Sequence, residues 1–148
     1  ILGRPFDLDV CALPQTAKVA DYYSLENGDD GLALPWQNLN WCNPEFSSIM
    51  PWIEKAVSEA KEFGRTTAMI MPNNPEVAYC RASKKHADTI IEMPYRVQYY
   101  RPNGEPFRDS KGRISSPQFS SMIAVFTTLG IITGSARHIC VDFREYMK

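Results

Sequence analysis

Residues 39–71 constrain the fold most, because they have the pattern of a strand, a helix and a second strand in close succession. Residues 39–42 form a short apolar run, and from Pro51 onward apolar side chains recur at helical spacing. Gly64 follows the last of them, at a position suited to a left-handed helix end, and the apolar run TTAMIM comes next. A strand, helix and strand within about thirty residues are typical of a βαβ unit. The sequence therefore predicts an α/β fold with a parallel sheet.

Shorter patterns predict further elements on both sides of this unit. Phe6, Leu8 and Val10 alternate with acidic residues, as in a strand. The run YRVQYY also alternates, and residues 105–116 after it are polar, basic and loop-like. The remaining predictions are a strand within 6–12, a short helix within 15–23, a helix over 76–87, strands over 89–93 and 121–127, and a terminal helix or strand within 135–148.

The composition is that of an ordinary globular protein. At 148 residues the chain can bury a sizeable core, and we expect residues 1–148 to form one domain. No apolar run approaches the roughly 20 residues of a membrane span, and the first ten residues lack the pattern of a signal peptide. The four cysteines have no metal-binding spacing, so we expect reduced thiols, no metal site and a cytoplasmic location.

Charge is unevenly distributed along the chain, although the net charge is only -1. Up to Cys80 there are five basic and eleven acidic residues, a balance of -6. The remainder has eleven basic and six acidic residues, a balance of +5. Such a split is typical of a basic half that faces a polyanion, and solvated surfaces produce it as well. Charge alone leaves both interpretations open.

Residues 41–48, WCNPEFSS, are the strongest candidate for chemistry. Asn43 carries a neutral amide whose oxygen can accept a hydrogen bond from an amino group. The carbonyl of Pro44 is a second acceptor on a rigid turn, and Phe46 offers a flat face to a base. Together these groups suit an exocyclic amine. An ordinary Asn-Pro turn after a strand, with a Phe in the core, would have the same sequence.

The order of several segments extends this pattern over most of the chain. FDLDVCA is followed by DDGLALPW, by NLNWCNPEFSSIMPWIEKA, by a strand that ends in Pro72, and by SPQFSSMIAVF. Over residues 6–127 this order resembles the phage-type, Dam-like family of DNA N6-adenine methyltransferases. The resemblance implies a compact Rossmann-like methyltransferase sheet, mostly parallel, with helices on both faces. It also implies S-adenosylmethionine as the methyl donor.

The resemblance assigns roles to individual residues. The N6 amine of adenine is a poor nucleophile because its lone pair is delocalised into the ring. Two acceptors on its hydrogens would let the nitrogen direct that lone pair at the methyl group, so catalysis would consist of orientation and charge stabilisation. By this resemblance the catalytic residues are Asn43, Pro44 and Phe46, and the cofactor-binding residues are Asp9, Val10, Cys11, Ala12, Asp30 and Leu32.

Double-stranded DNA is the partner that the resemblance implies. A paired adenine cannot reach such a pocket, so it must flip out of the duplex, with Phe46 replacing the lost stacking. With no separate target-recognition domain, selectivity should be short or lax, and a homodimer is a reasonable way to span a duplex. Basic side chains would bind phosphates, and the candidates are Arg81, Lys84, Lys85, Arg96, Arg101, Arg108, Lys111 and Arg113.

Two departures from the family pattern keep an alternative open. Glu45 stands where the family has a second Pro, which adds a negative charge beside the DNA site. The space between Asp9 and Asp30 is short, and the loop ALPQTA has no glycine, so cofactor affinity could be low unless Asp21 contributes. A catalytically silent DNA-binding or inhibitory protein of methyltransferase fold is therefore the alternative function. Methylation of RNA or of a protein amide is a third.

Overall fold

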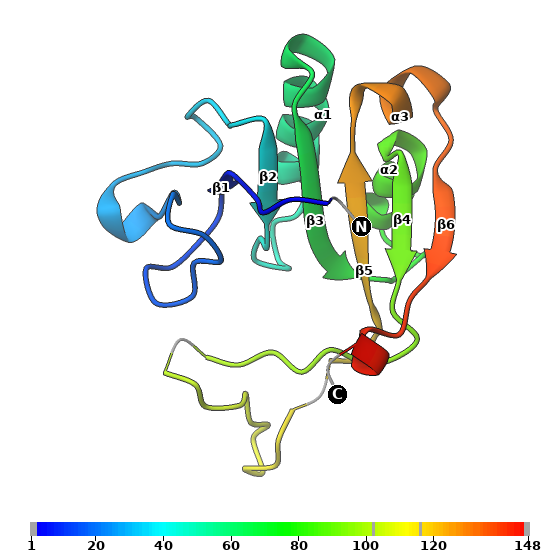
Figure 1. Cartoon of the computed structure of the whole chain (residues 1–148). Coiled ribbons are helices and arrows are strands. Elements are labelled where there is room, and N and C mark those ends of the chain that lie inside the picture. Colours follow the sequence, from blue (N-terminus) through cyan, green and yellow to red (C-terminus); the bar gives the residue numbers. More distant parts are fainter. Residues whose placement is uncertain (1–2, 102, 116, 147–148) are drawn as a thin grey trace.

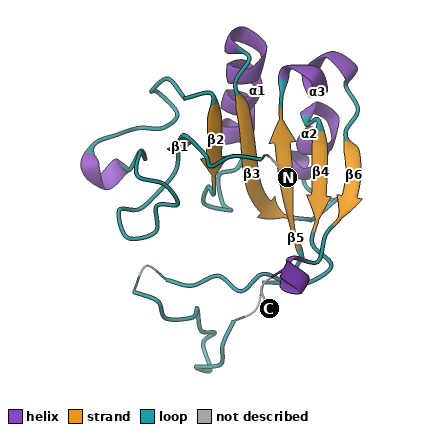
Figure 2. Cartoon of the chain, in the orientation of Figure 1, coloured by secondary structure: helices purple, strands orange, loops and turns teal. Residues whose placement is uncertain are grey.

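A six-stranded sheet forms the centre of the molecule, with strand order β1-β2-β3-β5-β4-β6 (Figure 1). The structure is a computed structural model that describes residues 3–101, 103–115 and 117–146. The strands are β1 (Leu8–Asp9), β2 (Leu39–Cys42), β3 (Thr66–Pro72), β4 (Thr89–Glu92), β5 (Ser121–Phe126) and β6 (Arg137–Cys140). The helices are α1 (Met50–Phe63), α2 (Ala78–His86) and α3 (Thr128–Thr133), with short 3-10 turns η1 (Leu25–Asn27) and η2 (Phe143–Tyr146) (Figure 2).

The predicted βαβ unit is confirmed. β2 and β3 pair in parallel, with Leu39 opposite Thr66, and α1 connects them. Pro51 lies in the first turn of α1, where its missing N–H costs no helical hydrogen bond. Gly64 ends the helix with φ of 69°, and its N–H bonds to the carbonyls of the last turn. Local sequence signals therefore place both ends of this helix correctly.

The sheet is mixed, so the expectation of a mostly parallel sheet is wrong. β5 runs antiparallel to both of its neighbours, β3 and β4. The reason is the connection between β4 and β5, which leaves and re-enters the sheet at the same edge without a crossover helix. Met93 marks this edge, because its N–H donates to the carbonyl of Ser121 at 3.1 Å. The α/β class is confirmed, whereas the sheet is not clearly Rossmann-like.

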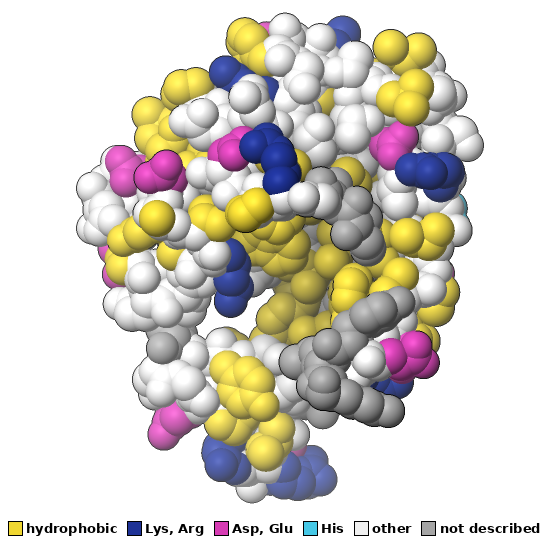
Figure 3. Space-filling view, in the orientation of Figure 1, with side chains coloured by type: hydrophobic (Ala, Val, Ile, Leu, Met, Phe, Trp, Pro, Cys, Tyr) yellow, Lys and Arg dark blue, Asp and Glu magenta, His cyan; other side chains and the backbone are white. Residues whose placement is uncertain are grey.

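The three α-helices pack on one face of the sheet, so the expectation of helices on both faces is also wrong for the described residues. α1 contacts both α2 and α3. On the opposite face Phe6 and Phe143 pack over a smaller cluster around Ala68, Ile91 and Val125. These two segments leave an apolar hollow of about 310 Å³, which faces the viewer in Figure 3.

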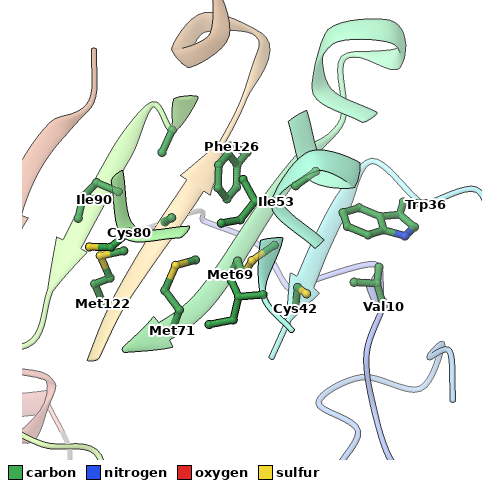
Figure 4. Packing of buried hydrophobic residues seen from close by; sticks show 14 of the residues in the cluster. Val10, Trp36, Cys42, Ile53, Met69, Met71, Cys80, Ile90, Met122 and Phe126 are labelled. Atoms are coloured by element: carbon green, nitrogen blue, oxygen red, sulfur yellow. The ribbon is translucent and has the colours of Figure 1, made fainter. Parts of the chain in front are cut away.

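The main core lies between the sheet and the helices (Figure 4). Met69 and Phe126 project from adjacent strands toward Ile53 of α1, whereas Met122 lies beside Cys80 of α2, and all of them are buried. Burying one such side chain contributes roughly 1.5–3 kcal/mol relative to leaving it exposed. Glu59 is also buried, and it is paired with Lys55 and Arg65, which meets the cost of its charge.

The N-terminal segment departs from its predicted structure. β1 covers only Leu8–Asp9, and residues 15–23 form turns rather than a helix. The chain folds back here, because Tyr23 donates to the Asp9 carbonyl and Asp9 donates to the carbonyl of Asp21. The run 95–100 contains one isolated bridge rather than a strand. Within the described ranges, no helix has the length and apolar character to cross a membrane.

Candidate active site

The predicted catalytic and cofactor segments leave the same edge of the sheet. β1, β2 and β3 are parallel neighbours, so their carboxyl ends lie together (Figure 1). Val10 extends the β1–β2 pairing, because its N–H donates to the carbonyl of Trp41 at 3.0 Å. The loop that begins at Asn43 therefore lies beside the loop that begins at Cys11. Carboxyl ends of parallel strands are the usual place for ligands in α/β folds.

The two hydrogen-bond acceptors of the NPEF loop have no partner among the described residues. The amide of Asn43 is exposed, and it takes part in none of the hydrogen bonds between described side chains and backbone. Pro44 is buried, and its carbonyl likewise accepts no bond there. The loop is closed instead by Ser48, whose N–H donates to the carbonyl of Glu45 at 3.0 Å. Both acceptors are thus available to a ligand.

Phe46 is 39% exposed, a high value for a large aromatic side chain. Its ring meets the ring of Tyr99 edge to face, with centroids 5.1 Å apart and an interplanar angle of 87°. At most one face of Phe46 is covered by such a contact. The exposed part of the ring is available for contact with a ligand.

Asp9 is engaged with its own chain. Its carboxylate accepts from the backbone N–H of Lys18 at 3.1 Å and of Cys11 at 3.3 Å, which fixes the loop after β1. Burial raises the pKa of Asp9, against the lowering effect of these two amides. The Asp9 side chain is only 2% exposed, so its main contribution is to the shape of this loop.

Cys11 lies between two carboxylates. Burial raises the pKa of its thiol to about 12, and the negative charges of Asp9 and Glu45 add to the effect. The thiol is therefore protonated at neutral pH and is not a nucleophile. Glu45 itself is part of the loop after β2, which lies beside the loop after β1 because the two strands pair in parallel. Among the described residues, no three His, Cys, Asp or Glu side chains gather where they could hold a metal ion.

The structure brings the second cofactor segment against the first. Asp30 accepts from the N–H of Leu32 at 2.9 Å, which tightens the turn. Between them Gly31 lies so close to β1 that a Cβ on it would be 2.0 Å from the Val10 carbonyl oxygen. The indole N–H of Trp36 donates to the Gly31 carbonyl at 2.7 Å and anchors the turn in the core. The two predicted cofactor segments, residues 9–12 and 30–32, are thus in direct contact, and we call them together the cofactor wall.

A long connection between β4 and β5 emerges at the same edge (Figure 1); we call its described residues, 94–101, 103–115 and 117–120, the arm. Its two limbs are tied by Gln98, whose amide donates to the Ser115 carbonyl at 3.2 Å. A hollow of about 210 Å³ lies between the arm and the NPEF loop. It is lined by Phe46, Gln98, Tyr99, Phe107, Ser115 and Pro117.

The candidate DNA-binding residues lie on two elements, α2 and the arm. One group lies on α2, where Lys84 forms an ion pair with Glu92 at 3.5 Å. The other group is on the arm, beside the candidate catalytic loop. The α2 group is Arg81, Lys84 and Lys85, and the arm group is Arg96, Arg101, Arg108, Lys111 and Arg113.

Comparison with known proteins decides the family. The model of the family described as DNA N-6-adenine-methyltransferase (Dam) matches residues 2–134. The chain belongs to this family. A DNA N-6-adenine-methyltransferase of Haemophilus phage HP1 is 31% identical to it over 87 residues, which are 58% of this chain and 49% of the phage protein. The Dam-family chain thus matches about half the length of that relative. No solved structure matches it.

Sequence reasoning missed three residues at this site of the Dam-family chain. Gly31 appeared only as part of a motif, although its lack of a side chain is what lets two segments touch. Tyr99 and Gln98 were assigned no role because their partners are distant in sequence. The Asp-Gly pair could have pointed to Gly31, since glycine before an apolar segment often marks a close backbone approach. No comparable signal existed for the other two.

Proposed function

We propose that this Dam-family protein transfers a methyl group from S-adenosylmethionine to the N6 amine of adenine in double-stranded DNA. The observation that carries the proposal is the pair of unused acceptors, the Asn43 amide oxygen and the Pro44 carbonyl. They lie at the edge where the two cofactor segments meet. Membership of the family supports the reaction and the DNA substrate.

The residues at this edge fit the methyl donor. S-adenosylmethionine, when bound, supplies a methyl group on a positively charged sulfonium. The wall formed by residues 9–12 and 30–32 would hold it, with Asp30 exposed at the turn. Exposed carboxylates near the site, including Glu45, favour a cationic ligand.

Asn43 and Pro44 would activate the adenine amine by orienting it. When the amide oxygen of Asn43 and the carbonyl of Pro44 each accept one N–H, the nitrogen lone pair is free to attack the methyl carbon. An N–C bond forms as the S–C bond breaks, both electrons of which stay on sulfur, and the extra proton leaves the nitrogen for solvent. The site supplies orientation and stabilises the developing positive charge. No covalent bond to the protein is needed.

Access to the amine requires the adenine to leave the duplex. Phe46, which is partly exposed, would replace the lost stacking. Basic side chains of the arm would bind the phosphates on either side of the flipped adenine. The protein would act as a monomer or as a homodimer. In a phage, such methylation would protect the viral DNA from restriction in the host cytoplasm.

A second candidate function is DNA binding without turnover, and one residue favours it. Glu45 replaces the second Pro of the family tetrad, and its charge lies near the cofactor loop. Without the second Pro the turn is less rigid, which would weaken the orientation of the adenine amine while the basic side chains of the arm still bind DNA.

One experiment separates the two candidates. The protein is incubated with S-adenosylmethionine labelled in its methyl group and with unmethylated duplex DNA, which is then digested to nucleosides. Label in N6-methyl-2′-deoxyadenosine supports the proposal that the protein is a methyltransferase. DNA binding that does not depend on cofactor, with no label in any nucleoside, would support the silent protein instead. If Asn43 binds the adenine amine, Asn43→Ala should lose the labelling. Asn38→Ala, altered at an exposed Asn before the same strand, is its matched control and should keep it.

A further inference from the structure

Tyr99 is held rigidly at the root of the arm. Its hydroxyl is hydrogen-bonded to Oγ of Ser121, the first residue of β5, at 2.9 Å. Burial raises the pKa of the Tyr99 hydroxyl, so the group stays a neutral hydrogen-bonding partner. The neighbouring Tyr100 is 59% exposed instead. Tyr99 is therefore fixed to the sheet, whereas the next residue faces solvent.

This fixed ring is in contact with the ring on which the base would stack. Phe46 lies on a short exposed loop. Among the described residues no hydrogen bond is made to the backbone of Phe46, so the orientation of its ring depends on packing. The edge-to-face contact with Tyr99, at 5.1 Å between centroids, is a directional one. It orients Phe46 relative to the start of β5 rather than to its own loop.

The same two rings border the hollow of about 210 Å³ between loop and arm. Its volume is below the roughly 300 Å³ at which sites for drug-sized ligands begin, and suits a single planar ring system. Three of its six lining residues are aromatic, namely Phe46, Tyr99 and Phe107. The arm thus carries basic side chains, and near β4 and β5 it also lines this hollow.

We propose that Tyr99 is a positioning residue that sets the orientation of Phe46 for stacking on the flipped adenine. This inference rests on the proposed function and adds a residue to it. Tyr99 acts through Phe46 and does not take part in the methyl transfer itself. Loss of one edge-to-face contact of this kind should reduce the population of correctly oriented Phe46 roughly two- to tenfold.

A double-mutant cycle tests the inference. The variants are Tyr99→Leu, Phe46→Leu and the pair, with Tyr99→Phe as the conservative change and Tyr100→Leu as the matched control. Methyl transfer to unmethylated duplex DNA is measured together with the Kd for DNA, the Kd for S-adenosylmethionine and the unfolding temperature. Tyr99→Leu should lower kcat roughly two- to tenfold while both Kd values stay within twofold. Tyr99→Phe, which keeps the ring but loses the bond to Ser121, should give a rate between those of Tyr99→Leu and wild type.

The cycle distinguishes positioning from a general structural role. If Tyr99 acts through Phe46, the pair of substitutions should be no slower than Phe46→Leu alone. Losses that multiply in the pair, or a Tyr99→Leu protein as fast as wild type, would overturn the inference and leave the proposed function standing. A loss that Tyr100→Leu shares would overturn it too. A wild-type protein that transfers no label would overturn the proposed function, and this inference with it.

Discussion

Replacing Gly31 by Ala should separate the two segments that are proposed to bind the cofactor. The added Cβ would lie 2.0 Å from the Val10 carbonyl oxygen and 3.0 Å from the Trp52 ring. An ordinary van der Waals contact begins at 3.4 Å, so the turn must move by more than an ångström. Backbone lies on one side and a core indole on the other, so neither neighbour can yield easily.

Both stability and cofactor affinity should fall in Gly31→Ala. Overpacking of this kind costs about 1–3 kcal/mol of unfolding free energy. A displacement of an ångström at a ligand-positioning segment can cost on the order of 100-fold in rate. We expect the Kd for S-adenosylmethionine to rise at least tenfold, roughly 1.4 kcal/mol of binding free energy.

Titration calorimetry with S-adenosylmethionine and chemical denaturation measure the two effects. Gly28→Ala is the matched control, because it lies in the same segment and a Cβ there would meet nothing within 4 Å. Its φ of 87° makes Ala strained, at a cost of about 1–2 kcal/mol, without moving Gly31. Cofactor affinity should therefore survive in Gly28→Ala. A Gly31→Ala protein with wild-type affinity would refute the assignment of this wall to the cofactor.

Other predictions concern the arm and the buried ion pair. Removing Arg108 and Lys111 together should lower the slope of log Kd for DNA against log salt by about two, measured by fluorescence anisotropy, and removing Arg81 and Lys85 should change it less. A larger effect of the α2 pair would contradict the placement of DNA on the arm. Burial raises the pKa of Glu59, but hydrogen bonds from its two cationic partners outweigh burial and hold the pKa below 4.5. Its contribution to stability is thus present above pH 4.5 and is lost as the pH falls through the lowered pKa. Glu59→Gln should lower the unfolding free energy by about 2 kcal/mol at pH 7, which is less than the loss of a fully buried ion pair costs, because Lys55 and Arg65 are partly exposed. It should also reduce the fall of the unfolding free energy at acidic pH, measured by denaturation at a series of pH values. An unchanged fall at acidic pH would contradict this account.

Local patterns predicted the parts of the fold that depend on local interactions. The ends of α1 follow from Pro51 and Gly64, and β2 was placed at its observed bounds because its apolar run ends at an Asn-Pro turn. The direction of β5 could not be predicted in this way. It depends on where the chain re-enters the sheet after the arm, and hydrophobic patterning has the same form in both directions.

The candidate site was predicted as a set of segments rather than as a geometry. The order of motifs placed Asn43, and parallel pairing of β1 and β2 explains why its loop lies beside the cofactor segments. Asp9 is predicted to serve the cofactor, and the sequence did not show that its carboxylate also binds two backbone amides of its own loop. Such use of a side chain depends on a turn that the pattern of residues 10–18 did not reveal. The contact of Phe46 with Tyr99 is equally long-range.

The rate of methyl transfer by Asn43→Ala tests the central claim most directly. The variant removes one of the two acceptors and leaves the strand, the cofactor wall and the arm in place. Single-turnover transfer to unmethylated duplex DNA is compared with wild type and with Asn38→Ala, with S-adenosylmethionine and DNA saturating. We predict a loss of at least 100-fold in Asn43→Ala, in line with the removal of a charge-stabilising group, and a wild-type rate in Asn38→Ala. Transfer by Asn43→Ala at the wild-type rate would contradict the account.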